Sequence, residues 1–326
     1  MRFSYIFRAD FSQKIGLGHL KRLLILKKKL KINPVWIVSG NNQIFERFEK
    51  KSKVIYVKNI YEEKKLISNL KNAGLKKVVL DISNSNNLKN NRYIKIFNIY
   101  KKLKFKIISY DLPFAKLNSD ISIIPYEFNR SILKKSNIEF KGSDYFINEN
   151  KKFKINNHRK KIKKILISIS GSDYKQIGYE IYKILEKENL NIRVLQGLNK
   201  NGFEQNSRNS FLNLNKNIQS HLNWSDLIIC GEGLIKYDAI YFNKPIIIIH
   251  QFDDKSDLIK TFLNQDMCLS LGIFRKEKKI YYREKILNYI NDKLLQELHI
   301  KNQQKIFNNK EIKKKQLYLF QKLKLL

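Results

Sequence analysis

The sequence predicts an α/β protein made of two doubly wound, Rossmann-like domains that face a central cleft. Strand-like and helix-like segments alternate along the whole chain, which is the pattern of repeated βαβ units. The strand-like segments, such as "PVWIVSG" and "KPIIIIHQ", are continuous apolar runs, as expected for parallel strands buried on both faces. The alternation stops once, at the polar residues 148–163, and then starts again. We therefore predict domains over residues 1–150 and 151–275, followed by a helical tail over 276–326.

The first predicted domain contains five strands, a short apolar piece and four helices. The strands are expected at residues 2–9, 34–40, 53–57, 76–82 and 105–111, and the apolar piece at 120–125. The helices are expected at residues 18–31, 43–50, 62–73 and 90–102. The first helix has the clearest pattern, because its leucines recur at helical spacing on one broad face: Leu20, Leu23, Leu24, Leu26 and Leu30.

The second predicted domain repeats this arrangement. Its strands are expected at residues 164–170, 192–197, 210–215, 226–233 and 244–251. Its helices are expected at residues 176–188, 216–223, 234–242 and 255–264. The tail that follows is an amphipathic, lysine-rich helical segment with no strong apolar seam for dimerisation. A cleft between two such domains is the usual ligand site.

The formal charge of +36 reflects lysines spread over the polar faces of the predicted helices. Lysine, isoleucine and asparagine are raised together, so the lysines are interpreted mainly as solvated surface. A peripheral contact with anionic membrane or an acidic substrate remains an alternative, and no module for nucleic-acid binding is present. The two cysteines match no metal or redox spacing, and no apolar run approaches the ~20 residues that span a bilayer. We expect a cytoplasmic protein.

Polar residues that follow the predicted strands are the candidates for ligand contacts, because ligands of open α/β sheets gather beyond the carboxyl ends of the strands. In the first half these residues are Asp10, Gly16, Gly18, His19, Asp81, Tyr110 and Asp111. In the second half they are Ser170, Gly171, Ser172, Asp173, Gly231, Glu232, Gly233, His250, Gln251, Asp253 and Asp254.

The turn Gly16-Leu17-Gly18-His19 is the most informative of these segments. Its glycines suit a strand-to-helix turn that takes positive φ or passes close to a ligand. Helix N–H groups after Gly18 and after Ser172 would favour an anionic oxygen such as phosphate. His19, in the first turn of a helix, is favoured as a neutral imidazole and can then act as a general base. A tight turn and a structural histidine remain the alternatives, and no metal-ligand grouping, Gly-x-Ser-x-Gly or Walker pattern is present.

The segment "FRADFSQKIGLGHLKRLLIL" resembles the opening of the UDP-sugar hydrolases of the pseudaminic-acid pathway (UDP-2,4-diacetamido-2,4,6-trideoxy-β-L-altropyranose hydrolase-like). In that family Arg-Ala-Asp, a variable stretch and Ile-Gly-x-Gly-His-x-x-Arg stand in this order. The resemblance continues in "ILISISGSDYKQ", at the place of a Gly-Gly-Ser-Asp loop, and in "WSDLIICGEGLIKYDAIYFNKPIIIIHQ". It implies a GT-B-like fold, similar to the bacterial glycosyltransferase that builds the lipid-linked peptidoglycan disaccharide.

The resemblance further implies hydrolysis of a UDP-activated amino sugar at the anomeric C–O bond, without metal or cofactor, in surface-glycan biosynthesis. His19 matches the catalytic histidine, which takes a proton from water. Asp10, Gly16, Gly18, Arg22 and Asp81 are the expected substrate-binding residues of the first half. In the second half, backbone amides of Ser170, Gly171, Ser172, Asp173, Gly231 and Gly233 would hold the diphosphate, Asp238 the ribose, and His250 and Gln251 the nucleotide.

The sequence departs from the family pattern at four places. Leu234-Ile235 replaces Ser-Thr, Asp238 replaces Glu, His250 replaces Asn, and Ser83 stands where the family has an active-site tyrosine. Two other functions therefore stay open: a GT-B glycosyltransferase with an alcohol acceptor, and a nucleotide-sugar-binding protein without catalysis. The nucleotide sugar is the expected small-molecule partner in all three.

Overall fold

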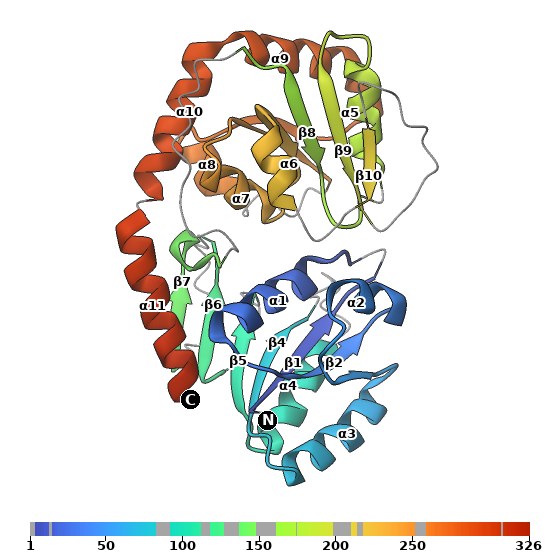
Figure 1. The fold of residues 1–326 in the computed structure, drawn as a ribbon, viewed down its shortest axis with the longest axis vertical. Coiled ribbons are helices and arrows are strands. Elements are labelled where there is room, and N and C mark those ends of the chain that lie inside the picture. The colour runs from blue at the N-terminus through green and yellow to red at the C-terminus, as the bar shows by residue number, and fades with distance from the viewer. Residues whose placement is uncertain are drawn as a thin grey trace. The chain divides into compact units, whose positions relative to one another are not determined.

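Two compact units make up the computed structural model (Figure 1), and each is described by itself. Unit 1 comprises Met1–Glu149 together with Lys310–Leu326, and unit 2 comprises Asn150–Asn309. The structure describes residues 4–12, 15–82, 92–111, 118–126, 137–147, 161–173, 175–197, 210–213, 218–251, 259–307 and 309–326. Most of the predicted polar linker over 148–163 lies outside these residues.

Unit 1 contains a seven-stranded parallel sheet in the order β3-β2-β1-β4-β5-β6-β7. Its strands are β1 (Tyr5–Asp10), β2 (Val35–Ser39), β3 (Val54–Tyr56), β4 (Lys77–Asp81), β5 (Lys106–Tyr110), β6 (Ile121–Ile124) and β7 (Ile138–Lys141). Its helices are α1 (Gly18–Leu30), α2 (Asn42–Phe48), α3 (Ile60–Asn72) and α4 (Arg92–Lys102), and a 3₁₀ turn, η1 (Ser143–Tyr145), follows β7. All six residues of β1 are buried, which agrees with the predicted two-sided burial of parallel strands.

Helices cover both faces of this sheet. Apolar residues of α3 and α4, such as Ile67 and Ile96, form one core with Ile6, Val78 and Leu80 of the strands. On the other face α1 contacts β1 and β4, and α2 brings an aromatic ring against β2. Because side chains alternate along a strand, neighbouring positions of β1 or β4 face different helices. This alternation decides which polar residues can meet at the ends of these strands.

Unit 2 contains a six-stranded parallel sheet in the order β10-β9-β8-β11-β12-β13. Its strands are β8 (Lys164–Ser168), β9 (Asn191–Gln196), β10 (Ser210–Asn213), β11 (Leu227–Cys230), β12 (Ile246–His250) and β13 (Leu269–Ile273). Its helical segments are α5 (Ile177–Leu185), α6 (Ile218–Trp224), α7 (Ile235–Tyr241), α8 (Lys260–Asn264), η3 (Lys276–Lys278), α9 (Lys279–Asn291) and α10 (Lys293–Ile306). Figure 1 shows α5 and α9 on one face of the sheet and α6 and α7 on the other.

The structure divides the residues of the predicted tail, 276–326, between the two units. Helix α9 places Tyr282 and Ile286 in the core of unit 2, whereas α11 (Asn309–Leu325) belongs to unit 1. Leu319 and Leu323 of α11 are fully buried, and Gln316 Nε2 donates hydrogen bonds to the carbonyls of Asp144 and Phe146. The tail divides because each helix has its own apolar stripe, and burial of that stripe stabilises a different unit.

Two strands, β7 and β13, were not predicted. Strand β7 reads Ile-Glu-Phe-Lys, and its charged residues Glu139 and Lys141 are exposed, so it lacks the continuous apolar run of the other strands. Strand β13 contains Gly272 at φ 70°, which interrupts a strand pattern. Among the described helices, none combines the length with the apolar character that crossing a membrane requires.

Candidate functional site

The strand order of unit 1 reverses direction between β1 and β4, which pair with Ala9 opposite Asp81. The chain leaves β1 toward α1 on one face and leaves β4 toward α4 on the other. The carboxyl ends of such a strand pair are where open α/β sheets bind ligands. The residues that follow β1 and end β4 therefore form the candidate site of unit 1.

The Gly16–His19 turn joins β1 to α1. Gly16 has φ 82°, a conformation that favours glycine, and its N–H donates to the Ser12 carbonyl at 2.7 Å. Gly18 is the first residue of α1 and does not share this positive φ. A Cβ placed on Gly18 would meet no atom within 4 Å, so the start of α1 is open. The N-cap residue Leu17 offers no side-chain cap, which leaves the first N–H groups of α1 without one.

His19 and Asp81 form a close pair. His19 Nδ1 lies 2.6 Å from Asp81 Oδ1, and the His19 side chain is 17% exposed whereas Asp81 is fully buried. A carboxylate oxygen accepts a hydrogen bond and cannot donate one, so we assign the proton to Nδ1. When the ring is neutral, this tautomer leaves a lone pair on Nε2.

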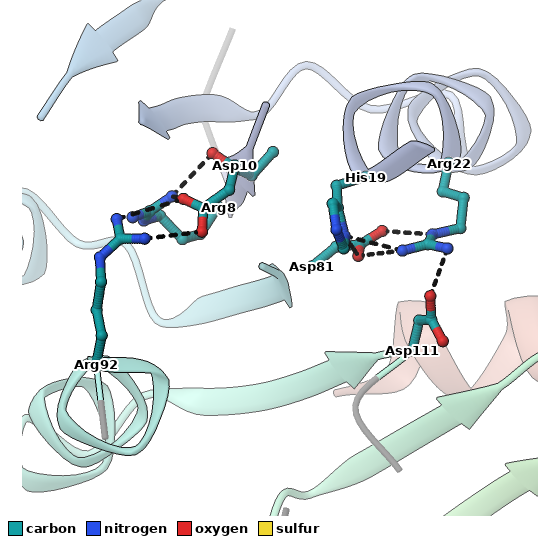
Figure 2. Close-up of polar contacts among 8 residues, drawn as sticks. Arg8, Asp10, His19, Arg22, Asp81, Arg92 and Asp111 are labelled. Carbon is teal, nitrogen blue, oxygen red and sulfur yellow. Dashed lines mark hydrogen bonds and ion pairs between the residues drawn. The ribbon is translucent and has the colours of Figure 1, made fainter. Parts of the chain in front are cut away.

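Arg22, one turn further along α1, holds the other side of Asp81 (Figure 2). Its Nε and Nη2 donate to the two carboxylate oxygens at 2.8 and 2.7 Å, a bidentate geometry. Arg22 Nη2 also lies 2.9 Å from His19 Nδ1; since a guanidinium only donates, this contact is not a hydrogen bond when Nδ1 carries the proton. Arg22 Nη1 pairs with Asp111 Oδ2 at 2.5 Å, and its guanidinium lies 5.5 Å from the centre of the Tyr110 ring.

The charges of this His19–Asp81–Arg22–Asp111 group support one another. Burial alone raises the pKa of Asp81, but Arg22 and His19 outweigh burial, and the pKa lies below its usual value. Burial lowers the pKa of Arg22, and the carboxylates of Asp111 and Asp81 reverse this and raise it. Asp81 is thus held as a carboxylate. The backbone of Asp111 has φ 55°, a conformation that is rare for residues other than glycine.

Asp10, the other aspartate predicted for this site, lies in a different group. It points with Arg8 to the face covered by α3 and α4, because positions 6, 8 and 10 of β1 share one side. Asp10 Oδ1 accepts from Arg8 Nη1 at 2.7 Å, and Oδ2 pairs with Arg92 Nη1 at 3.0 Å. Arg8 Nε also donates to Glu63 of α3 at 2.7 Å. Burial raises the pKa of Asp10, but Arg8 and Arg92 lower it below its usual value overall.

Sequence reasoning missed the partners Arg8, Glu63 and Arg92, and gave Asp111 no role. Arg8 carried a signal, because a charged residue inside a buried apolar strand requires an ionic partner. Glu63 and Arg92 carried no such signal in their own helices. Ser83, which stands at the place of the family's tyrosine, lies outside the described residues.

In unit 2 the strand order reverses between β8 and β11, and the predicted residues follow β8, β11 and the adjacent β12. Ser170 Oγ accepts hydrogen bonds from the N–H groups of Ser172 and Asp173 at 3.2 and 2.7 Å. Asp173 in turn caps α5, and its two carboxylate oxygens accept from Ile177 and Gly178, each at 2.9 Å. Burial raises the pKa of Asp173.

That the helix N–H groups after Ser172 favour a phosphate oxygen stays a prediction, and the structure shows that two of them have a partner within the protein. The N–H groups that would bind an anion there already donate to Asp173 of the same loop. The N-cap residue of α5 is Gln176, whose side chain makes no capping hydrogen bond, so Asp173 supplies the acceptor for these two N–H groups from the preceding loop.

The Gly231–Gly233 turn, after β11, has free space beside it. A Cβ on Gly231 would lie 2.3 Å from the Ile169 carbonyl oxygen, whereas a Cβ on Gly233 would meet no atom within 4 Å. Glycine is thus required at 231 by the close approach of β8, and Gly233 borders open space. The Gln251 N–H lies 3.4 Å from Glu232 Oε2, and Lys175 Nζ donates to the Gln251 carbonyl at 2.5 Å.

The remaining predicted residues occupy the neighbouring strand end and helix. Asp238 is half-buried in the first turn of α7, and His250 is buried as the last residue of β12. Gln251 is buried, and its Oε1 has no hydrogen-bond partner among the described residues. In the described part of the chain, no group of three or more His, Cys, Asp and Glu side chains is arranged to hold a metal ion.

No protein-family model matches the chain. An uncharacterized protein of Methanocaldococcus jannaschii is 24% identical over 288 residues, which cover 78% of this chain and 57% of that protein. The chain thus spans little more than half the length of this curated relative.

Solved structures show the same fold at low sequence identity. The chain is similar to MurG of Acinetobacter baumannii (TM-score 0.62, 11% identity, 98% of this chain and 99% of that chain). It is also similar to the spinosyn rhamnosyltransferase SpnG (TM-score 0.64, 8% identity, 93% and 96%) and to S. aureus MnaA bound to UDP (TM-score 0.57, 15% identity, 94% and 94%). The two units thus form a two-domain, Rossmann-like GT-B fold, and the predicted fold class is confirmed.

Proposed function

We propose that this GT-B chain hydrolyses a UDP-activated amino sugar at the anomeric C–O bond and releases UDP, in the biosynthesis of a nonulosonic acid or another surface glycan. The observation that carries the proposal is the His19–Asp81 pair at the carboxyl end of the unit 1 sheet. The resemblance of residues 7–26 to the pseudaminic-acid pathway hydrolases supports the reaction type. The name of a similar solved structure, MnaA bound to UDP, supports the nucleotide.

His19 would act as the general base. Its Nε2 takes a proton from water, and the water oxygen forms a bond to C1 of the sugar. The bond between C1 and the diphosphate oxygen breaks, and UDP leaves with the electron pair. The resulting imidazolium then returns its proton to solvent. A positioned base contributes about 10²–10⁴-fold to such a step.

Asp81 and Arg22 would prepare His19 for this role. The Asp81 carboxylate accepts the Nδ1 proton, so Nε2 keeps its lone pair, and the same negative charge stabilises the imidazolium that forms. Arg22 and Asp111 hold the carboxylate in place. Asp10 acts at a distance from His19 in this scheme, by holding Arg8 and Arg92. Gly16 shapes the turn, and Gly18 leaves room at the start of α1.

The groups of unit 2 would bind the nucleotide. Because the amides of Ser172 and Asp173 are paired within their own loop, the Gly231–Gly233 turn is the stronger candidate for the diphosphate, with Ser170 and Gly171 beside it. Asp238 would bind ribose hydroxyls. Gln251 has a buried amide oxygen without a partner in the described structure, and His250 precedes it. The scheme uses no metal and no cofactor.

A GT-B glycosyltransferase is the second candidate. It is favoured by similar structures that are glycosyltransferases, such as SpnG and the calicheamicin glycosyltransferase CalG4. An alcohol acceptor would then replace water at His19, and the basic surface would hold the protein on anionic membrane from the cytoplasmic side. Acceptor-dependent turnover together with salt-sensitive binding to anionic liposomes would favour the transferase over the hydrolase. A nucleotide-sugar-binding protein without catalytic activity is the third candidate function.

The test is release of free UDP from a panel of UDP-amino sugars by wild type and His19→Ala. We expect turnover in water by wild type, loss of at least about 100-fold in His19→Ala, and unchanged UDP binding by calorimetry. Wild-type protein that binds UDP but cleaves no sugar nucleotide, under conditions in which a related hydrolase does, would contradict the enzyme proposal and support a binding protein.

A further inference from the structure

Lys236 of α7 is a buried lysine that sequence reasoning did not single out. Its side chain is 1% exposed, and its Nζ donates to the carbonyls of Glu232 and Gly233 at 2.6 and 2.9 Å. The ammonium also lies 4.7 Å from the centre of the Tyr237 ring and 5.4 Å from that of Phe262. Burying an ammonium group costs free energy unless hydrogen bonds and nearby rings compensate for the lost hydration. The groups that compensate here include two carbonyls of the segment that contains the Gly231–Gly233 turn.

The two hydrogen bonds determine which way the peptide groups of the turn face. No described peptide bond is cis, and in a planar trans peptide the C=O and the following N–H point in opposite directions. With the Glu232 and Gly233 carbonyls turned toward Lys236, the N–H groups of Gly233 and Leu234 point away from it. Among the described residues, neither N–H donates to a backbone carbonyl, and Gly233 borders open space.

We propose that Lys236 is a positioning residue that orients the Gly231–Gly233 turn so that the Gly233 and Leu234 N–H groups bind the diphosphate of the substrate. This inference rests on the proposed function, since it takes the diphosphate as the ligand, and it names the part of the site that holds it. The buried positive charge adds to the effect, because its attraction for an anion is screened little by solvent.

The oriented amides can compensate for two hydroxyl groups that the family pattern has and this sequence lacks. Leu234 and Ile235 stand where the resemblance implies Ser-Thr, and their side chains cannot hydrogen-bond a phosphate. Oriented amides with a cation behind them supply attraction for an anion that does not depend on side-chain hydroxyls. Substitution at Lys236 should therefore change affinity for UDP more than it changes the chemical step at His19.

Lys244 provides a matched control. It is also a buried lysine of unit 2, and its Nζ also donates to a backbone carbonyl, that of Ser225. Lys244 precedes β12 and Ser225 precedes β11, so this pair lies at the amino end of the strands, the end opposite the Gly231–Gly233 turn. Replacing either lysine removes the same charge from the same unit, but only Lys236 touches the turn.

The experiment measures binding of UDP and of inorganic pyrophosphate to wild type, Lys236→Met and Lys244→Met by calorimetry. We expect Lys236→Met to weaken UDP binding at least about ten-fold, the effect of losing one or two oriented hydrogen bonds, and Lys244→Met to change it less than about two-fold. In turnover assays Lys236→Met should raise KM and leave kcat nearly unchanged. Equal UDP affinity in Lys236→Met and wild type overturns the role of Lys236 and leaves the proposed function standing.

A second variant keeps the test decisive if Lys236→Met does not fold. Gly233→Ala adds one methyl group into open space without a positive φ, so its melting temperature should match wild type, while UDP affinity falls because the methyl group meets the phosphates. Unchanged affinity in Gly233→Ala overturns the proposed location of the diphosphate. Wild type that binds neither UDP nor pyrophosphate overturns both this inference and the proposed function, whereas UDP binding without hydrolysis overturns only the hydrolase.

Discussion

His19 Nδ1 lies 2.6 Å from Asp81 Oδ1, although 62 residues separate the two in the sequence. The contact exists because β1 and β4 are neighbours in the sheet, with Ala9 opposite Asp81. Position 81 points to the face that α1 covers, since Val78 and Leu80 belong to the core on the other face. The strand order places β4 beside β1, and the alternation of side chains along β4 directs the Asp81 carboxylate toward the His19 imidazole.

Asp81→Asn should reduce kcat by at least about 100-fold, because an amide does not stabilise the imidazolium as a carboxylate does. Affinity for UDP should stay within about two-fold of wild type. In the proposed mechanism Asp81 contacts His19, the general base, and does not contact the nucleotide. Asp111→Asn is the comparison, because Asp111 reaches His19 only through Arg22; its effect on kcat should be smaller. Equal kcat in wild type and Asp81→Asn would contradict the proposed dyad.

Glu63→Gln should lower the free energy of unfolding by about 3 kcal/mol, because it leaves the buried Arg8 guanidinium short of one anionic partner. Arg8 and Glu63 are 0% and 1% exposed, so water does not replace the lost charge. Urea unfolding followed by circular dichroism measures the change. The surface pair Lys183–Glu186 is the control, and Glu186→Gln should leave the unfolding midpoint where it is. Similar midpoints for both variants would refute the importance of the buried pair.

Stability should decrease as the pH falls below about 6.5, in part because of His221. Burial and the neighbouring Arg193 lower the pKa of His221 in the folded protein, and neither ring nitrogen has a hydrogen-bond partner among the described residues. The unfolded chain therefore binds a proton at a higher pH than the folded one, so stability is lost as the pH falls from the unfolded pKa toward the folded pKa. His221→Leu should flatten this dependence. Parallel curves of urea midpoint against pH for the two proteins would contradict the assignment.

Leu323→Ala should destabilise the protein by about 2–5 kcal/mol, because Leu323 of α11 is fully buried in unit 1. Leu325, two residues later in the same helix, is 79% exposed, and Leu325→Ala should change stability by less than about 0.5 kcal/mol. Thermal unfolding of the two variants side by side tests whether α11 is part of the unit 1 fold. A Leu323→Ala protein as stable as Leu325→Ala would contradict its packing.

Many elements of the fold could be predicted from local patterns. The apolar runs of β1, β2, β4, β8, β11 and β12 and the leucine face of α1 lie within short windows of sequence, and the structure places strands and a helix there. Strands β7 and β13 were not predicted, because exposed charged residues in β7 and an internal glycine in β13 weaken the apolar pattern. The sequence also did not indicate that the Asp173 carboxylate accepts hydrogen bonds from the N–H groups of Ile177 and Gly178, because a local pattern does not show which acceptor a helix N–H group meets.

The sequence by itself determined the alternation of strands and helices, the two-sided burial of the strands and the glycine turn that presents His19, because each depends on residues close together along the chain. Only the tertiary structure decided that Asp81 and Arg22 surround His19, that Asp10 belongs to a separate ion-paired group, and that α11 returns to unit 1. These outcomes depend on strand order, register and the choice of packing partner, which arise from contacts between residues far apart in sequence and are not encoded in local periodicity.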